Sequence, residues 1–122
     1  MNILLWIAQG ILAGVFAGAG IMKLVTSKPK LEQMKGFGYV TERTPTEMKL
    51  RGLAEVLGAF GLILPWLLRL LPALTPLAAL ALAVLMSGAF VTHRRRKEPV
   101  WLVSALLVLL VFVAVGRALS LS

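Results

Sequence analysis

Four long apolar segments, separated by short polar connections, constrain what this chain can fold into. The first runs from residue 3 to residue 22 without a charged side chain. At about 1.5 Å per residue, a helix of this length spans about 30 Å, the thickness of the hydrocarbon core of a bilayer. Three similar segments follow. The predicted fold class is therefore all-α, an integral membrane four-helix bundle. It forms a single transmembrane domain over residues 1–122, with helices at about residues 3–24, 46–68, 72–92 and 99–117.

The composition agrees with lipid as the surrounding solvent. The chain is 59% hydrophobic and only 15% charged, whereas a soluble domain is typically about 45–50% apolar and about 25% charged. A soluble protein of this length has too little interior to bury so much apolar surface. No Lys or Arg precedes the first segment, and it is longer than the apolar region of a signal peptide. We therefore expect it to be retained as a helix.

The distribution of charge predicts the orientation in the membrane. The net charge is +8, with 13 Lys and Arg residues against five acidic ones. The basic residues in or beside the first and third connections are Lys23, Lys28, Lys30, Lys35, Arg43, Lys49, Arg51, Arg94, Arg95, Arg96 and Lys97. The positive-inside rule then places the connections 27–45 and 93–98 in the cytoplasm and both termini on the non-cytoplasmic side. Nucleic acid is not an expected partner, because the charges flank apolar spans and form no basic face on a soluble module.

The connection 27–45 has an apolar periodicity of its own. Leu31, Met34 and Phe37 recur at helical spacing between lysines, which favours a short helix lying on the lipid head groups. An ordinary solvated loop fits the same periodicity equally well.

Prolines and a threonine predict where the later helices begin and end. Thr46 is the expected cap of the second span, with Glu47 in its first turn. Pro65 predicts a break or kink near the end of that span. Pro72 or Pro76 is expected to open the third span, and Pro99 the fourth.

Four ionisable residues are predicted to lie near one membrane level. Lys23 ends the first span, Arg51 and Glu55 lie in the first half of the second, and His93 closes the third. Because positions i and i+4 share a helix face, Glu55 is expected to face the bundle and to pair with Arg51 or Lys23. One interpretation is a structural ion pair that fixes the first two spans together. The other is a polar pocket rim that binds a head group, a quinone ring or a proton. For His93, the simpler interpretation is an interfacial position near head groups.

Three further sets of residues have predicted roles at the membrane surface or between helices. The run Arg94, Arg95, Arg96 and Lys97 is expected to anchor the topology and to contact anionic lipid head groups. Trp6, Trp66 and Trp101 lie near span ends, as in an aromatic belt. The glycines with a predicted role in helix packing are Gly10, Gly14, Gly18, Gly58 and Gly61. Small residues at this spacing let helices approach closely, inside the bundle or, through the first span, in a dimer.

The sequence offers no set of catalytic residues. It contains no cysteine, so disulfide exchange, thiol oxidation and thiolate metal sites are excluded. No phosphate-binding loop, zinc-ligand spacing or serine–histidine–acid arrangement is apparent, and no metal site is predicted. We expect an accessory protein and not an autonomous enzyme.

Several segments resemble the DoxX and DoxX-like family of small four-span bacterial membrane proteins. They are the run AGAG at 17–20 followed by Met22-Lys23-Leu24, the segment RGLAEVLGAFGLILP at 51–65, LTPLAA at 74–79, residues 86–93 and Gly116-Arg117. The resemblance implies a four-helix bundle in the bacterial plasma (inner) membrane and a link to respiratory oxidoreduction. The name-giving members look like a small subunit of a thiosulfate:quinone oxidoreductase or quinol oxidase complex.

The resemblance therefore leads to a functional expectation with alternatives. The first is an accessory subunit or scaffold of a quinone-linked redox system, with quinone as the candidate cofactor and membrane redox proteins as partners. The second is a scaffold or assembly chaperone without a redox role. The resemblance also implies relatives that scaffold redox partners in the membrane and distant animal relatives that assist receptor assembly. A small transporter would need a polar stripe through the membrane, which the third and fourth spans lack. Membrane lipids are expected partners, and a homo-oligomer through the first span fits the glycine spacing.

Overall fold

The computed structural model describes residues 2–34, 38 and 44–121, and its regular elements are all helices. They are α1 (Asn2–Val25), α2 (Lys28–Glu32), α3 (Pro45–Leu68), α4 (Leu74–Arg95) and α5 (Trp101–Leu119). Four of them, α1, α3, α4 and α5, are long and apolar enough to cross a membrane. The prediction of an all-α, four-span membrane protein is confirmed.

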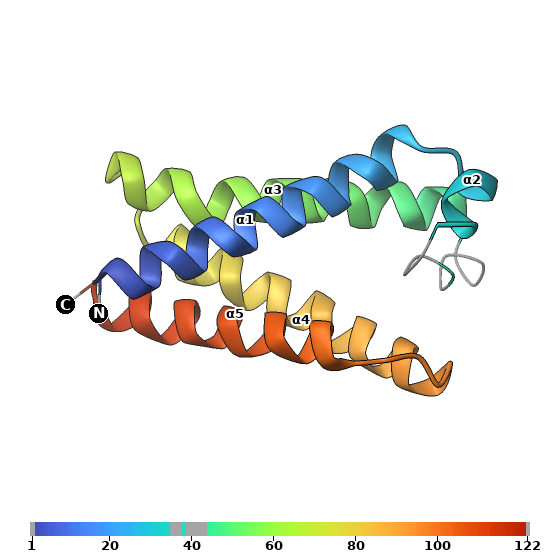
Figure 1. The fold of residues 1–122 in the computed structure, drawn as a ribbon. Coiled ribbons are helices and arrows are strands. Elements are labelled where there is room, and N and C mark those ends of the chain that lie inside the picture. Colours follow the sequence, from blue (N-terminus) through green and yellow to red (C-terminus); the bar gives the residue numbers. More distant parts are fainter. Residues whose placement is uncertain (1, 35–37, 39–43, 122) are drawn as a thin grey trace.

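The four long helices pack as a bundle with two distinct ends (Figure 1). α1 packs mainly against α3, and α4 packs mainly against α5, while contacts of α3 with α4 and of α1 with α5 close the bundle. α1 begins and α5 ends at the same end, which we call the terminal end. α2 and the connection between α4 and α5 lie at the opposite end, which we call the α2 end.

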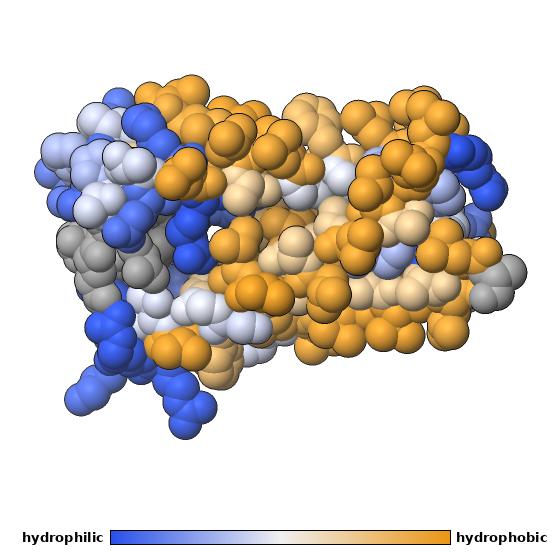
Figure 2. Space-filling view, turned by 180° about the vertical axis from the view of Figure 1, so that it is seen from behind, coloured by the Kyte–Doolittle hydropathy of each residue, from blue (hydrophilic) through white to orange (hydrophobic). Residues whose placement is uncertain are grey.

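Apolar side chains fill the interior of the bundle and also cover its outside. The interior is filled by residues such as Leu12, Phe16, Leu62, Leu82 and Leu110, which are almost fully buried. The outside of the long helices carries many large apolar side chains, which form a broad hydrophobic surface between more polar ends (Figure 2). A soluble protein of this size would not expose such a surface, so the outside of the bundle is a lipid-facing surface.

The start of α3 corrects one predicted helix cap. The backbone N–H of Glu47 donates a hydrogen bond of 3.1 Å to the hydroxyl of Thr44, which is the N-cap, and Pro45 is the first helical residue. The prediction that Thr46 is the cap is wrong. Pro45 explains the difference, because proline favours the first helical position and so moves the boundary towards the N-terminus.

A break or kink was predicted at Pro65, and the helix does not break there, because α3 runs through this proline to Leu68. A proline inside a helix leaves the carbonyl four residues earlier without its usual donor. Here that carbonyl belongs to Gly61, and it accepts a hydrogen bond of 3.0 Å from the hydroxyl of Thr75 on α4. The neighbouring helix therefore satisfies the group that Pro65 leaves free, as membrane bundles often do.

α2 covers the start of α3. Leu31 of α2 is fully buried and packs with Met48 of α3, and Met34 is partly buried beside them. The short helix predicted in this connection is present, and its apolar side packs against α3. Phe37, Lys35 and Arg43 lie outside the described residues.

The glycines divide into two groups that their spacing did not distinguish. A Cβ atom on Gly58 would lie 2.7 Å from a methyl carbon of Leu82, and one on Gly61 would lie 2.8 Å from the Cβ of Ala78, so these two glycines lie at the contact with α4. The glycines of α1 that repeat every fourth residue, Gly10, Gly14 and Gly18, are exposed and would have nothing within 4 Å of an added Cβ. Packing of these three inside the bundle was a wrong prediction, while an interface between copies through α1 stays a prediction.

α1 and α3 approach each other closely at Gly20 and Gly52. A Cβ on Gly20 would lie 2.6 Å from the carbonyl oxygen of Gly52, and a Cβ on Gly52 would lie 2.8 Å from the carbonyl oxygen of Gly20. The backbones of α1 and α3 are therefore almost in contact at this level, which lies in the half of the bundle nearer the α2 end.

Candidate functional site

Lys23 of α1 and Glu55 of α3 form an ion pair between the two helices, in which the Nζ of Lys23 donates to Oε1 of Glu55. Their side chains are only 4% and 3% exposed. Of the two partners predicted for Glu55, the structure shows that Lys23 is the one it contacts. A buried charge is tolerated only with such a partner, because desolvation of an isolated ion costs several kcal/mol.

The sequence brings this pair together through the two glycines beside it. Gly20 precedes Lys23 by three residues, and Gly52 precedes Glu55 by three residues, so each glycine lies one turn from its charged residue on the same face. Close contact of the backbones at the glycines draws the two side chains within reach. The ion pair and the glycine contact therefore form one structural unit.

Arg51 points away from this pair and lies in a groove between α3 and α4. Its Nη2 donates a hydrogen bond of 3.3 Å to the carbonyl oxygen of Leu85, while its Nε is buried without a hydrogen-bond partner. The groove has a volume of about 360 Å³ and is lined by Glu47, Leu50, Arg51, Ala54 and Leu85. It combines a cationic donor, an exposed carboxylate at one side and apolar walls, which is the composition expected of a site for an amphipathic molecule.

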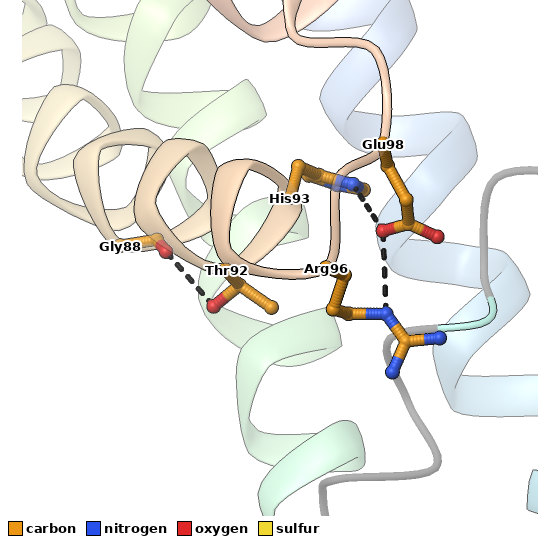
Figure 3. Close-up of polar contacts among 5 residues, drawn as sticks. All are labelled: Gly88, Thr92, His93, Arg96 and Glu98. Carbon is orange, nitrogen blue, oxygen red and sulfur yellow. Dashed lines mark hydrogen bonds and ion pairs between the residues drawn. The ribbon is translucent and has the colours of Figure 1, made fainter.

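His93 takes part in a third arrangement at the end of α4 (Figure 3). Its Nδ1 lies 2.9 Å from Oε1 of Glu98, and Nε of Arg96 lies 3.3 Å from the same oxygen. These contacts fasten the start of the α4–α5 connection to the end of α4. Arg94, Arg95 and Lys97 are exposed at the same end, where their contact with lipid head groups stays a prediction.

The four predicted rim residues therefore divide among several partners. Lys23 and Glu55 meet between α1 and α3, Arg51 reaches α4, and His93 pairs with Glu98. Arg51 and Glu55 were expected to share a face, yet positions four apart differ by about 40° around a helix. That angle is enough for the long side chain of Arg51 to reach α4 while Glu55 faces α1.

A second polar cluster, at the terminal end, was missed from the sequence. Arg117 of α5 is only 2% exposed. Its Nε donates a hydrogen bond of 2.6 Å to the side-chain oxygen of Gln9, and its Nη1 donates one of 2.9 Å to that of Asn2. Its guanidinium lies over the rings of Trp66 and Trp6, at 4.5 Å and 5.3 Å from the ring centres.

The remaining hydrogen bond of this cluster fixes α1 to α3. Gln9 is fully buried, and its amide nitrogen donates a hydrogen bond of 2.6 Å to the carbonyl oxygen of Leu62. A glutamine inside an apolar segment is the sequence signal that could have revealed the cluster, since polar groups within a span seek polar partners. Trp66 is buried and Trp6 is partly buried, both against Arg117. The prediction that Trp66 belongs to an aromatic belt is therefore wrong. Trp101 is 72% exposed, as a residue of such a belt would be.

The polar residues described at the two ends of the bundle do not resemble a metal centre. Among the described residues there is no group of three or more His, Asp or Glu side chains close enough to hold a metal ion. The polar groups instead offer cationic hydrogen-bond donors beside apolar helix surfaces.

The fold and these clusters define the chain as a small, four-span integral membrane protein with polar groups concentrated near both ends of its bundle. It belongs to the DoxX-like family, whose sequence model matches residues 7–116. This match covers most of all four spans and confirms the resemblance found in the individual segments. Comparisons with curated proteins and with solved structures found no match.

Proposed function

We propose that the protein is an accessory subunit of a quinone-linked membrane redox system, and that it holds a quinone in the groove at Arg51. The observation that carries this proposal is the Nε of Arg51, a buried cationic donor without a partner in a groove with apolar walls. The family membership supports the redox association. The chain contains no cysteine, so the redox chemistry would belong to the ligand or to partner proteins, which makes the role accessory.

The groove suits a molecule with an oxygen-bearing head and an apolar tail. A quinone carbonyl oxygen is a hydrogen-bond acceptor, and the guanidinium of Arg51 is the donor that it would meet. Leu50, Ala54 and Leu85 would contact the ring and the first part of the tail. A few convergent polar groups in a largely apolar concavity are sufficient for such a site.

Arg51→Ala tests this proposal directly. We expect about a tenfold loss of quinone that co-purifies with the protein, because one hydrogen bond to a charged group contributes about 1.5–3 kcal/mol. The measurement is quantitative mass spectrometry of quinones and lipids extracted from the purified protein. Arg94→Ala is the matched control, since it removes an exposed arginine from the same end of the bundle. Equal quinone content in wild type and Arg51→Ala would contradict the proposal.

The second candidate function is a scaffold or assembly factor without a redox role. The exposed line of Gly10, Gly14 and Gly18 favours it, because small residues on the lipid-facing side of α1 allow another transmembrane helix to approach closely. The partner would be a membrane protein or a second copy of this chain. An unchanged quinone profile in Arg51→Ala, with loss of a co-purifying membrane protein in Gly14→Leu, would favour this second function.

We further propose that the protein lies in the bacterial inner membrane with its α2 end in the cytoplasm. The basic residues gather at the α2 end, whereas Arg69 and Arg117 are the basic residues of the terminal end, and this asymmetry supports the orientation. A reporter fused after Ser122 is expected to read as external, and one inserted at Arg95 as cytoplasmic. A cytoplasmic signal from the fusion at Ser122 would contradict the proposed orientation.

A further inference from the structure

We propose that the terminal end carries a separate phospholipid site, in which Arg117 binds the lipid phosphate and the groove between α1 and α3 holds an acyl chain. The site lies at the opposite end of the bundle from the groove at Arg51. It does not depend on the proposed quinone association.

The first argument is an incomplete set of hydrogen bonds. The guanidinium has donors on three nitrogens. Two of these nitrogens bind Gln9 and Asn2, but Nη2 of Arg117 is buried without a partner. A buried donor without a partner is unfavourable, and more so when it is charged. The position therefore calls for an acceptor that the described residues do not supply.

The second argument is a positive charge that no described carboxylate neutralises. The glutamates of the described residues, Glu32, Glu47, Glu55 and Glu98, lie in α2, in the first half of α3 or just after α4, all towards the α2 end. At the terminal end, Arg69, which follows α3, adds a second positive charge that repels the charge of Arg117. Two cations without a described carboxylate at this end favour an anion, and phosphate pairs with arginine through two parallel hydrogen bonds.

The third argument is an apolar groove that leads to Arg117. It lies between α1 and α3, has a volume of about 390 Å³, and is lined mainly by Ala13, Gly14, Ala17, Phe60, Ile63 and Leu64. On α1, residues 6, 10, 13 and 17 share one face by helical spacing. The face therefore continues from the groove past Gly10, which has open space above it, to Trp6. Trp6 and Trp66 contact the guanidinium, so this face of α1 ends beside the cation.

The first turn of α1 determines access to the cation. Asn2 and Trp6 both contact Arg117 from this turn, and both are at least partly exposed. A phosphate that replaces the side-chain oxygen of Asn2 would accept hydrogen bonds from Nη1 and Nη2 together. The uncharged acceptor seen in the structure would thus be exchanged for a charged one, with an acyl chain lying along the small residues of α1.

Tryptophan fluorescence can report on this site alone. In a Trp101→Phe background, Trp6 and Trp66 are the remaining tryptophans, and both contact Arg117. We would titrate the protein in detergent with phosphatidylglycerol that carries brominated acyl chains, which quench nearby tryptophans. Brominated diacylglycerol has the same tails without the phosphate, and inorganic phosphate has the anion without the tails.

The lipid series gives the first set of outcomes. We expect phosphatidylglycerol to bind at least about tenfold more tightly than diacylglycerol, as one or more charge-assisted hydrogen bonds imply. Equal affinities would overturn the role of the phosphate. Full competition by millimolar inorganic phosphate would overturn the lipid as occupant and leave a site for free anions.

Substitutions at Arg117 and Gly14 give the second set of outcomes. Arg117→Gln is expected to bind phosphatidylglycerol no more tightly than diacylglycerol. If that variant fails to fold, Gly14→Leu still decides, because its added side chain enters the groove where a Cβ meets no atom within 4 Å. We expect Gly14→Leu to weaken phosphatidylglycerol binding about tenfold by displacing about two methylene groups of the chain. Gly88→Leu is the matched control on the exposed face of α4, and an equal loss there, or no loss in Gly14→Leu, would overturn the groove assignment.

Discussion

Glu55→Ala is expected to lower the free energy of unfolding by about 3–5 kcal/mol, because it leaves the ammonium group of Lys23 buried without its partner. SDS-induced unfolding of the purified protein in mixed micelles measures this quantity. Glu47→Ala is the matched control on the same helix. Its side chain is exposed, and it contributes at most a favourable interaction with the helix dipole, so its loss should cost less than about 1 kcal/mol.

A double variant separates the loss of the pair from the loss of packing volume. Lys23→Met combined with Glu55→Leu removes both charges and keeps apolar side chains of similar size between α1 and α3. Replacing a buried ion pair with well-packed apolar residues is often neutral or stabilising, so the double variant is expected to be more stable than Glu55→Ala. Equal unfolding of Glu55→Ala and Glu47→Ala would contradict a buried charge pair.

The fold was predictable from the sequence because the membrane imposes a length on apolar segments. The long apolar run of α1 and the basic connections around it leave few alternatives to four spans. The spacing of Leu31 and Met34 fitted a short helix and a loop equally well, and the structure shows the helix α2. The cap at Thr44 did not follow, because either of two nearby threonines fits the general preference and the position of Pro45 decides between them.

The contacts of the candidate site were harder to predict, because the residues that form them are distant from one another in the sequence. Glu55 was recognisable as a buried carboxylate, but the choice of Lys23 over Arg51 depends on the contact between Gly20 and Gly52. The spacing of glycines shows that they share a face but not which neighbour that face meets. For that reason Gly10, Gly14 and Gly18 could not be assigned to the lipid side from sequence alone.

The cluster around Arg117 illustrates a different limit. Trp6, Trp66 and Arg117 each lie near the end of a span, where tryptophan and arginine are common for reasons of interfacial solvation. Each residue alone therefore has an ordinary explanation. Their joint role appears only when α1, α3 and α5 are placed together and Gln9 is seen to bridge them. Two polar residues at opposite ends of the sequence but at one membrane level are the signal to look for.

The second large effect is expected at Gly20, where α1 and α3 touch. In Gly20→Leu, the new Cβ would lie 2.6 Å from the carbonyl oxygen of Gly52 and 2.7 Å from a methyl carbon of Val56, so the helices must separate. We expect a loss of about 3 kcal/mol, the upper part of the usual range for overpacking. Gly18→Leu is the matched control, since the same substitution two positions earlier meets nothing within 4 Å.

A combination with Glu55→Ala tests whether the glycine contact acts through the ion pair. Separating α1 from α3 at Gly20 also draws Lys23 away from Glu55, because Lys23 lies one turn further along α1. In the Glu55→Ala background this part of the damage has already occurred, so Gly20→Leu should cost less than it does in the wild type. Full additivity of the two losses in SDS-induced unfolding would show that the glycine contact and the buried pair are independent. If the combined variant loses less stability than the two single losses add up to, the close approach of the two backbones holds the charges together, as the positions of Gly20 and Gly52 indicate.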